Sequence, residues 1–250
     1  MSSQNEFKIA MQFLTRLPVA GEIEQTDESF ARSARFYPAV GLIVGVIAAA
    51  VFFVADIFLP NYVASAFALL SAVVVTGGLH EDGLADAFDG LIGGQDRTRI
   101  LEIMRDSGIG TYGMLALIFG VLLKLSAIGE MWGWDAFWAL IVAHALSRHA
   151  MVEVIGRYDY ARSDSAKFSK PSVSGEDLTY ARLWVLGVLA GSALFLGLWA
   201  TLMGLAIMAV AVSGFAQFFV RRIGGYTGDC LGATQQIAEA TFLVGLLVWL

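Results

Sequence analysis

The sequence predicts an all-α fold: a polytopic membrane bundle of about seven transmembrane helices with an N-terminal interfacial helix. The 250 residues are 57% hydrophobic and only 15% charged, whereas a soluble domain has about 25% charged residues. The mean hydropathy is +0.69. Apolar runs of roughly 18 or more residues recur along the chain, and such a run crosses a bilayer core of about 30 Å. We expect residues 1–250 to form a single integral-membrane domain.

The first expected element is a helix within residues 1–37, a polar segment with one amphipathic patch. The apolar residues of this patch lie near helical spacing, which is typical of a helix lying on a membrane surface. They are Phe7, Ile9, Ala10, Phe13, Leu14 and Leu17. The expected spans follow at 38–59, 62–79, 111–129, 136–155, 183–199, 203–220 and 231–250, the last with a polar first half.

Basic residues set the expected orientation of these spans. Fourteen of the sixteen lie in residues 1–37, 80–110, 156–182 and 221–230, and the short turns between the other span ends have none. With seven spans the two kinds of connection alternate without exception. The positive-inside rule then places the polar segments in the cytosol of a bacterial inner-membrane protein, with the C-terminus outside.

The charge balance and the cysteine count exclude several classes of protein. A net charge of −6 argues against nucleic acid as a partner, because nucleic-acid binding needs a basic face. The single cysteine, Cys230, permits no intramolecular disulfide and no cysteine zinc cluster. The N-terminus lacks the basic and apolar regions of a cleaved signal peptide. Membrane lipid is an expected partner, and homo-oligomerisation stays open.

The densest candidate site is the acidic segment 80–90. Asp82, Asp86 and Asp89 are spaced i, i+4, i+7, which places them on one helical face. Carboxylates that share a face repel one another unless a cation lies between them, and oxygen ligands suit Mg²⁺ or Mn²⁺. The alternative is a solvated acidic face. His80 and Glu81 lie off this face, where we expect them to be supporting groups.

A second candidate segment, residues 97–113, precedes the 111–129 span. It contains basic, serine and glycine residues of the kind that surround a phosphate: Arg97, Arg105, Ser107, Gly108 and Gly110. Backbone N–H groups at a helix N-terminus favour anions, and glycine permits close approach. The segment is therefore a candidate phosphate-binding loop. The alternative is a flexible loop with a helix cap.

Glycine-rich residues 224–233 open the last span on the same side of the membrane. Asp229 is placed to complete the metal site, and Thr227 is a candidate substrate-binding residue. The alternative is that Thr227 or Asp229 caps the helix.

Charged residues inside the spans point to partners or to a cavity. An arginine within a membrane helix costs about 3 kcal/mol on insertion scales. We therefore expect Arg148, which shares a face with His144, either to reach a substrate phosphate or to form a structural ion pair. Lys124 is expected to snorkel or to pair. The polar loop 156–182 carries four basic residues that either bind a polyanionic substrate or only determine topology: Arg157, Arg162, Lys167 and Lys170.

With these segments in hand, the chain resembles the adenosylcobinamide-GDP ribazoletransferase (cobalamin 5′-phosphate synthase) family over nearly its whole length. The resemblance rests on Phe13-Leu14-Thr15-Arg16-Leu17-Pro18, on Phe36-Tyr37-Pro38 with Gly41, and on residues 80–90, 104–113 and 224–234. The acidic segment is also similar to that of CDP-alcohol phosphotransferases. It departs from their pattern, because the Ala-Arg pair is absent and Asp86 and Asp89 replace the second aspartate pair.

The resemblance implies the last assembly step of the cobalamin nucleotide loop. Adenosylcobinamide-GDP would react with α-ribazole or α-ribazole 5′-phosphate, and GMP would leave. Phosphoryl transfer needs positioning, charge neutralisation and a base near the attacking hydroxyl. Under this resemblance Mg²⁺ on Asp82, Asp86 and Asp229 would bridge the diphosphate, and Asp89 would be the base. Arg105 and Arg148 would stabilise the developing charge.

The rival function is an ion-coupled transporter, in which carboxylates with His144 and Arg148 form a relay. Transporter sites lie near the midplane between repeats, whereas this acidic cluster follows a span at the membrane edge and no repeat is visible. The sequence has no His-Glu-x-x-His motif, so an intramembrane metalloprotease is set aside.

Overall fold

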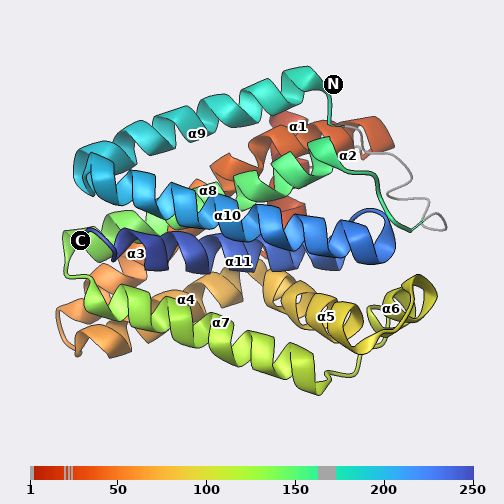
Figure 1. Ribbon diagram of the computed structural model, residues 1–250. Coiled ribbons are helices and arrows are strands. Elements are labelled where there is room, and N and C mark those ends of the chain that lie inside the picture. The colour runs from red at the N-terminus through yellow and green to blue at the C-terminus, as the bar shows by residue number, and fades with distance from the viewer. Residues whose placement is uncertain (1–2, 20, 22, 24, 163–172) are drawn as a thin grey trace.

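The computed structural model describes residues 3–19, 21, 23, 25–162 and 173–250, and within these ranges it is helical with no β-strand (Figure 1). The elements in order are α1 (Ser3–Leu14), α2 (Asp27–Ser33), the 3-10 helix η1 (Ala34–Phe36), α3 (Tyr37–Asp56), α4 (Asn61–Thr76), α5 (Leu79–Gly93), α6 (Arg97–Ile103), α7 (Thr111–Glu130), α8 (Trp134–Arg157), α9 (Gly175–Phe195), α10 (Leu198–Ile223) and α11 (Gly228–Leu246). The predicted all-α fold is confirmed.

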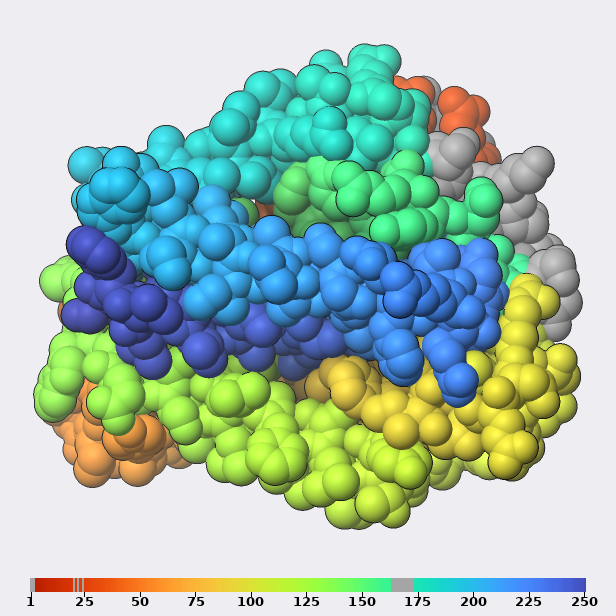
Figure 2. Space-filling model, in the orientation of Figure 1, coloured from red at the N-terminus to blue at the C-terminus, as the bar shows by residue number. Residues whose placement is uncertain are grey.

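The long helices run back and forth along one axis of the molecule (Figure 1). The turns after α3, α7 and α9 lie at one end with the C-terminus, and α6 and the turn between α10 and α11 lie at the other. Helix α11 packs against α10, α5, α8 and α7. On the face seen in Figure 2, α7, α9 and α10 are broadly exposed, with parts of α8, α11 and the α5–α6 region beside them. Short turns and polar connections therefore alternate between the two ends, as the sequence predicts.

The multi-pass prediction is confirmed, although the count of seven spans is approximate. Among the described helices, five stretches are long and apolar enough to cross a membrane: Asp27–Asp56, Thr111–Glu130, Trp134–Arg157, Gly175–Phe195 and Leu198–Ile223. The bent pair α4 and α5 makes a sixth if it is taken as one span. Helix α11 is not among them, because its buried face carries Gln235, Gln236 and Glu239.

Two glycines lie between α4, which ends at Thr76 before the predicted end of the span at 79, and the acidic helix α5. Gly77 and Gly78 have φ angles of +69° and +70°, a left-handed conformation that glycine adopts without strain. The chain bends by 89° between α4 and α5 at this point. The break turns α5 away from α4 and directs the acidic segment against α7 and α11.

The predicted N-terminal amphipathic helix exists as α1, but its apolar face is packed against protein. Ala10 and Leu14 belong to a core cluster that also contains Leu84 of α5. Buried Glu6 forms ion pairs with Arg32 and Arg35, which fasten α1 to α2 and η1. The buried apolar residues of α1 therefore contact the bundle, and the location of this helix at the membrane surface stays a prediction.

Helices α3 and α8 approach closely where α3 carries small residues. A Cβ atom built on Gly45 would lie 2.7 Å from the Cα atom of Ile141, and Gly41 faces the backbone of His144 in the same way. Small residues four apart let membrane helices pack backbone to backbone. Helix α8 is thereby held in the centre of the bundle, behind the site described next.

Candidate functional site

The acidic segment, residues 80–90, forms most of α5. Asp82 is exposed, Asp86 is half-buried and Asp89 is buried. The carboxylates of Asp229 and Asp82 both lie near enough to Asp86 to repel its negative charge. The prediction that these aspartates lie on one helix is confirmed, but their surroundings differ.

Asp89 is held by the start of α7. Its Oδ2 accepts a hydrogen bond of 2.7 Å from the Gly110 N–H, and its Oδ1 accepts one of 2.9 Å from the Gly113 N–H. The side chain is 8% exposed. Because both oxygens are engaged, the geometry favours a positioning role for Asp89 over the role of base, which stays a prediction.

The same contact changes the interpretation of the predicted phosphate-binding loop. The N-terminus of α7 already binds an anion, the Asp89 carboxylate, and helix N-termini favour negative charge. Arg105, Ser107 and Gly108 lie exposed in the loop before α7, and the Gly108 N–H donates to Asp106 Oδ1 over 3.1 Å. The helix-cap alternative therefore accounts for Gly110, and the rest of the loop remains accessible.

Thr227 caps α11, as the alternative reading of residues 224–233 predicted. Its Oγ1 accepts a hydrogen bond of 3.2 Å from the Cys230 N–H. The same hydroxyl donates to Asp229 Oδ2 over 3.2 Å. Arg162 also contacts Asp229 Oδ2, at 2.8 Å. Thr227 and Arg162 thus fix the Asp229 carboxylate at the first turn of α11.

A short parallel bridge places Arg162 beside α11. The Tyr226 N–H donates to the Asp159 carbonyl over 2.9 Å, and the Ala161 N–H donates to the Tyr226 carbonyl over 2.8 Å. The rings of Tyr160 and Tyr226 meet edge to face, with centroids 5.4 Å apart. Burial, the nearby Tyr160 phenol and the Asp159 carboxylate raise the pKa of Tyr226 above its ordinary value. The phenol of Tyr226 is therefore harder to ionise than that of an exposed tyrosine.

Glycines bring α5 and α11 together. A Cβ atom built on Gly83 would lie 3.1 Å from the Cα atom of Gly232 and 3.2 Å from the Asp229 carbonyl oxygen. At this crossing Asp82 and Asp229, far apart in sequence, line one cavity. These two carboxylates were predicted to share a site. The crossing of α5 and α11 places both of them at the edge of the cavity.

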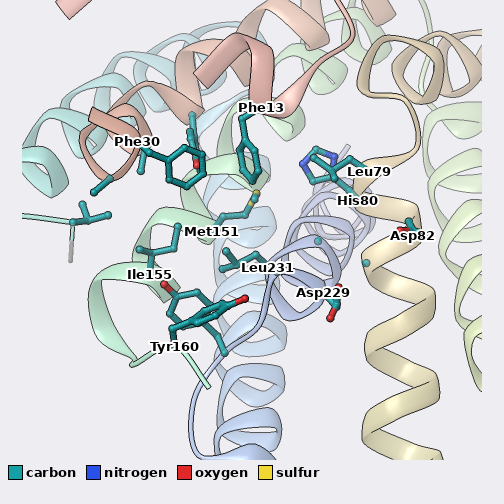
Figure 3. Close-up of a pocket in the computed structure, with 18 residues that line it drawn as sticks. Phe13, Phe30, Leu79, His80, Asp82, Met151, Ile155, Tyr160, Asp229 and Leu231 are labelled. Carbon is teal, nitrogen blue, oxygen red and sulfur yellow. The ribbon is translucent and has the colours of Figure 1, made fainter. Parts of the chain in front are cut away.

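The cavity has a volume of about 180 Å³ and lies between the N-terminal helices, α5, α8 and α11 (Figure 3). Asp82, Asp229 and His80 lie on one side of it, and Phe30, Ile155 and Tyr160 on the other. Its remaining wall is mostly apolar and includes Phe13, Ala31, Ala34, Met151, Val173 and Leu231. The arrangement suits a ligand that has a flat apolar part and lies next to a cation held by the two carboxylates.

The predicted metal ligands lie on two helices, Asp82 and Asp86 on α5 and Asp229 on α11. Among the described residues, no group of three or more histidine, cysteine, aspartate or glutamate side chains is arranged to enclose a metal ion. Mg²⁺, however, is commonly held by one or two carboxylates with substrate phosphates and water completing the shell. Asp82 and Asp86 on α5, with Asp229 across the crossing, fit this open kind of site.

Arg148 belongs to a buried network in the bundle core. Its Nη1 lies 3.0 Å from Glu239 Oε2 and 2.7 Å from His144 Nδ1. Lys124 Nζ donates to Glu239 Oε1 over 3.1 Å and to Gln236 Oε1 over 2.7 Å. The structural ion pair, not a substrate contact, therefore explains Arg148, and Lys124 pairs rather than snorkels.

Arg97 also has a structural environment. Its Nε donates to the Ile223 carbonyl over 2.9 Å and its Nη2 to the Ala161 carbonyl over 2.6 Å. These bonds join α6 to the end of α10 and to the segment that carries Arg162. Arg97 therefore braces these elements, and its predicted substrate-binding role stays a prediction. Lys167 and Lys170 lie outside the described residues.

Sequence reasoning named Arg162 only as one of the basic residues of the loop 156–182, and it missed the placement of the two tyrosines and the aromatic wall. Arg162 and Tyr160 lie in a polar loop that has no period to place them, and Tyr226 follows two glycines. Phe13 and Phe30 belong to a segment that was assigned to the membrane surface. Asp82 and Asp229, predicted as metal ligands, and His80, predicted as a supporting group, all lie in the cavity wall.

Comparisons with known proteins agree with one another. The family model described as Cobalamin-5-phosphate synthase matches residues 6–247. The relative named adenosylcobinamide-GDP ribazoletransferase from Shewanella amazonensis is 40% identical over 247 residues, covering 97% of this chain and 95% of the relative. The protein of the same name from Polaromonas naphthalenivorans is 36% identical over 269 residues, covering 97% of each chain. No solved structure matches.

The position of Asp89 generates a prediction about stability. Asp89→Asn leaves one backbone N–H facing an amide N–H₂, so we expect a loss of about 1.5–3 kcal/mol in the free energy of unfolding, the range for hydrogen bonds to a charged group. Thermal unfolding of the purified protein in detergent measures it, with Asp106→Asn in the exposed loop as the matched control. Unchanged stability of Asp89→Asn with lost activity would instead support the role of base.

Proposed function

Because this chain belongs to the cobalamin-5-phosphate synthase family, it is a transferase of cobalamin synthesis, and we propose that it joins adenosylcobinamide-GDP to α-ribazole or α-ribazole 5′-phosphate and releases GMP. The observation that carries this proposal is the shared cavity edge of Asp82 and Asp229 beside an aromatic wall. Such a site offers oxygen ligands for a metal-bound diphosphate next to space for a nucleoside.

The proposed reaction is a phosphoryl transfer. A ribose hydroxyl of the ribazole attacks the phosphorus atom that carries the cobinamide, a new P–O bond forms, and the bond to the GMP phosphate breaks. Bound Mg²⁺ or Mn²⁺ would neutralise the diphosphate charge. The chain's own residues orient the two substrates, hold the metal and take the hydroxyl proton.

We assign the metal to Asp82 and Asp86 and the proton to Asp229. Both oxygens of Asp89 are engaged by α7, so Asp229 is the remaining carboxylate at the cavity edge. Arg162 and Thr227 hold it in place. This assignment differs from the sequence-based hypothesis, in which Asp229 was a third metal ligand and Asp89 the base. Arg105 is retained from that hypothesis as a group that stabilises the leaving phosphate from its exposed loop.

The transporter alternative has less support. A relay would need His144 and Arg148. Both are buried and both contact the Glu239 carboxylate. The accessible carboxylates Asp82 and Asp229 lie instead at a cavity beside the polar end of the bundle. Their placement suits a water-soluble substrate that approaches from one side.

The experiment that tests the function measures GMP release by the purified protein with adenosylcobinamide-GDP and α-ribazole. We expect turnover with Mg²⁺ or Mn²⁺ and none after EDTA treatment. Asp82→Asn and Asp86→Asn keep an oxygen but lose a charge. We therefore expect them to raise the Mg²⁺ concentration for half-maximal rate by at least roughly 10- to 100-fold, the range found when a group that only supports a metal ligand is lost.

Asp229→Asn separates ligand from proton acceptor. A lost general base costs about 10²- to 10⁴-fold, and excess Mg²⁺ should not restore the rate. Recovery of Asp229→Asn at high Mg²⁺ would make Asp229 a metal ligand. Asp135→Asn, at the opposite end of the bundle, is the matched control and should behave as wild type. Full turnover in metal-free buffer would contradict the metal-dependent mechanism.

We further propose that the protein lies in the bacterial inner membrane with its cavity facing the cytosol, supported by the basic residues at the polar end. Reporter fusions after residues 95, 165 and 225 should report the cytosol, and a fusion at the C-terminus should report the periplasm. Lipid would then contact the exposed apolar surfaces, such as those of α7 and α9. A periplasmic signal at residue 165 would refute this orientation.

A further inference from the structure

The size of the cavity restricts what can occupy it. Its volume is about 180 Å³, and a cavity of roughly 150 Å³ holds benzene. A flat ring system somewhat larger than benzene therefore fits, whereas a corrin macrocycle is far too large. The cavity accordingly suits the base of a nucleoside, which could be the base of either substrate.

The wall of the cavity favours a base with carbon edges. Twelve of the eighteen lining residues are apolar or aromatic, and three of these twelve are the tyrosines Tyr37, Tyr160 and Tyr226, which also carry a hydroxyl. Guanine presents a carbonyl, an amino group and a ring N–H, each of which needs a polar partner when buried. The dimethylbenzimidazole base of ribazole is apolar except for one unsubstituted ring nitrogen.

His80 supplies one matching polar group in this wall. It is 1% exposed, and in the part of the chain that the structure describes neither ring nitrogen has a hydrogen-bond partner. Figure 3 shows its ring beside Phe13 at the edge of the cavity. A buried polar atom without a partner is costly, so a ligand atom that pairs with His80 gains binding free energy.

On the basis of the proposed function, we propose that this cavity binds the benzimidazole base of ribazole and that His80 donates a hydrogen bond to its unsubstituted ring nitrogen. The base lies against Phe13 and Phe30, and its ribose is directed to the side where Asp82 and Asp229 lie. The hydroxyl that attacks the phosphorus is then beside the proposed metal. The guanine and corrin of the other substrate bind outside this cavity.

Filling the cavity tests the site. Ala31→Leu on α2 adds volume to the wall, and Ala66→Leu on an exposed face of α4 is the matched control. Calorimetric titration of the full-length protein with α-ribazole alone should show roughly tenfold weaker binding for Ala31→Leu, since the added carbons over-pack the space that the ligand would fill. The control should bind as wild type, and the KM for adenosylcobinamide-GDP should stay within about twofold in both.

Replacing one ligand atom tests His80. The riboside of dimethylindole has a C–H group in place of the unsubstituted nitrogen, so the wild-type protein should bind it roughly tenfold more weakly than α-ribazole. His80→Phe keeps a ring but loses both nitrogens, and it should bind the two ribosides equally. A merely structural role for His80 would weaken both ligands alike and keep their ratio.

Three results overturn the inference. One is unchanged α-ribazole binding in Ala31→Leu with a thermal unfolding temperature like that of wild type. Another is a raised KM for adenosylcobinamide-GDP alone, and the third is a preserved tenfold preference in His80→Phe. If Ala31→Leu does not fold, the smaller Ala31→Val replaces it. Failure of the transferase assay would refute the proposed function but leave these binding titrations to decide the cavity's ligand.

Discussion

The crossing of α5 and α11 at Gly83 and Gly232 is the contact on which the candidate site depends. A Cβ atom on Gly83 would lie 3.1 Å from the Gly232 Cα atom, and one on Gly232 would lie 3.2 Å from the His80 carbonyl oxygen. Backbones can approach this closely only where side chains are absent. The contact brings the carboxylates of two distant segments to one cavity and places His80 in its wall.

A buried charge network around Glu239, further along α11 than Gly232, stabilises this crossing. Glu239 of α11 pairs with Arg148 and His144 of α8 and with Lys124 of α7. Gln236, one turn before Glu239, donates to Glu81 Oε1 on α5 over 2.9 Å. Removing one partner of a buried ion pair leaves an uncompensated charge and costs about 3–5 kcal/mol. The network therefore fixes the rotation of α11 and, with it, the direction of its first turn.

Sequence patterns predicted what depends on composition and local spacing. Apolar run length gave the bundle, and the i, i+4, i+7 spacing placed the aspartates on one helix. The same spacing could not show that Asp89 turns to α7, because both partner N–H groups lie more than twenty residues away. Arg97 and Arg148 looked functional for a related reason: a charge in an unexpected place predicts a partner but not whether that partner is ligand or protein. The bend at Gly77 and Gly78, which sets the direction of α5, could not be predicted either, because the spacing of apolar residues does not mark it.

Gly83→Val tests the central role of the crossing most directly. Its added carbons must push α5 from α11, and a displacement of about 1 Å at a catalytic site can cost 10²-fold in rate. We predict a loss of this size in GMP release, with thermal stability retained well enough to purify the protein. Gly187→Val, at a helical glycine whose added Cβ would meet nothing within 4 Å, should keep the wild-type rate. A wild-type rate in Gly83→Val would contradict the account.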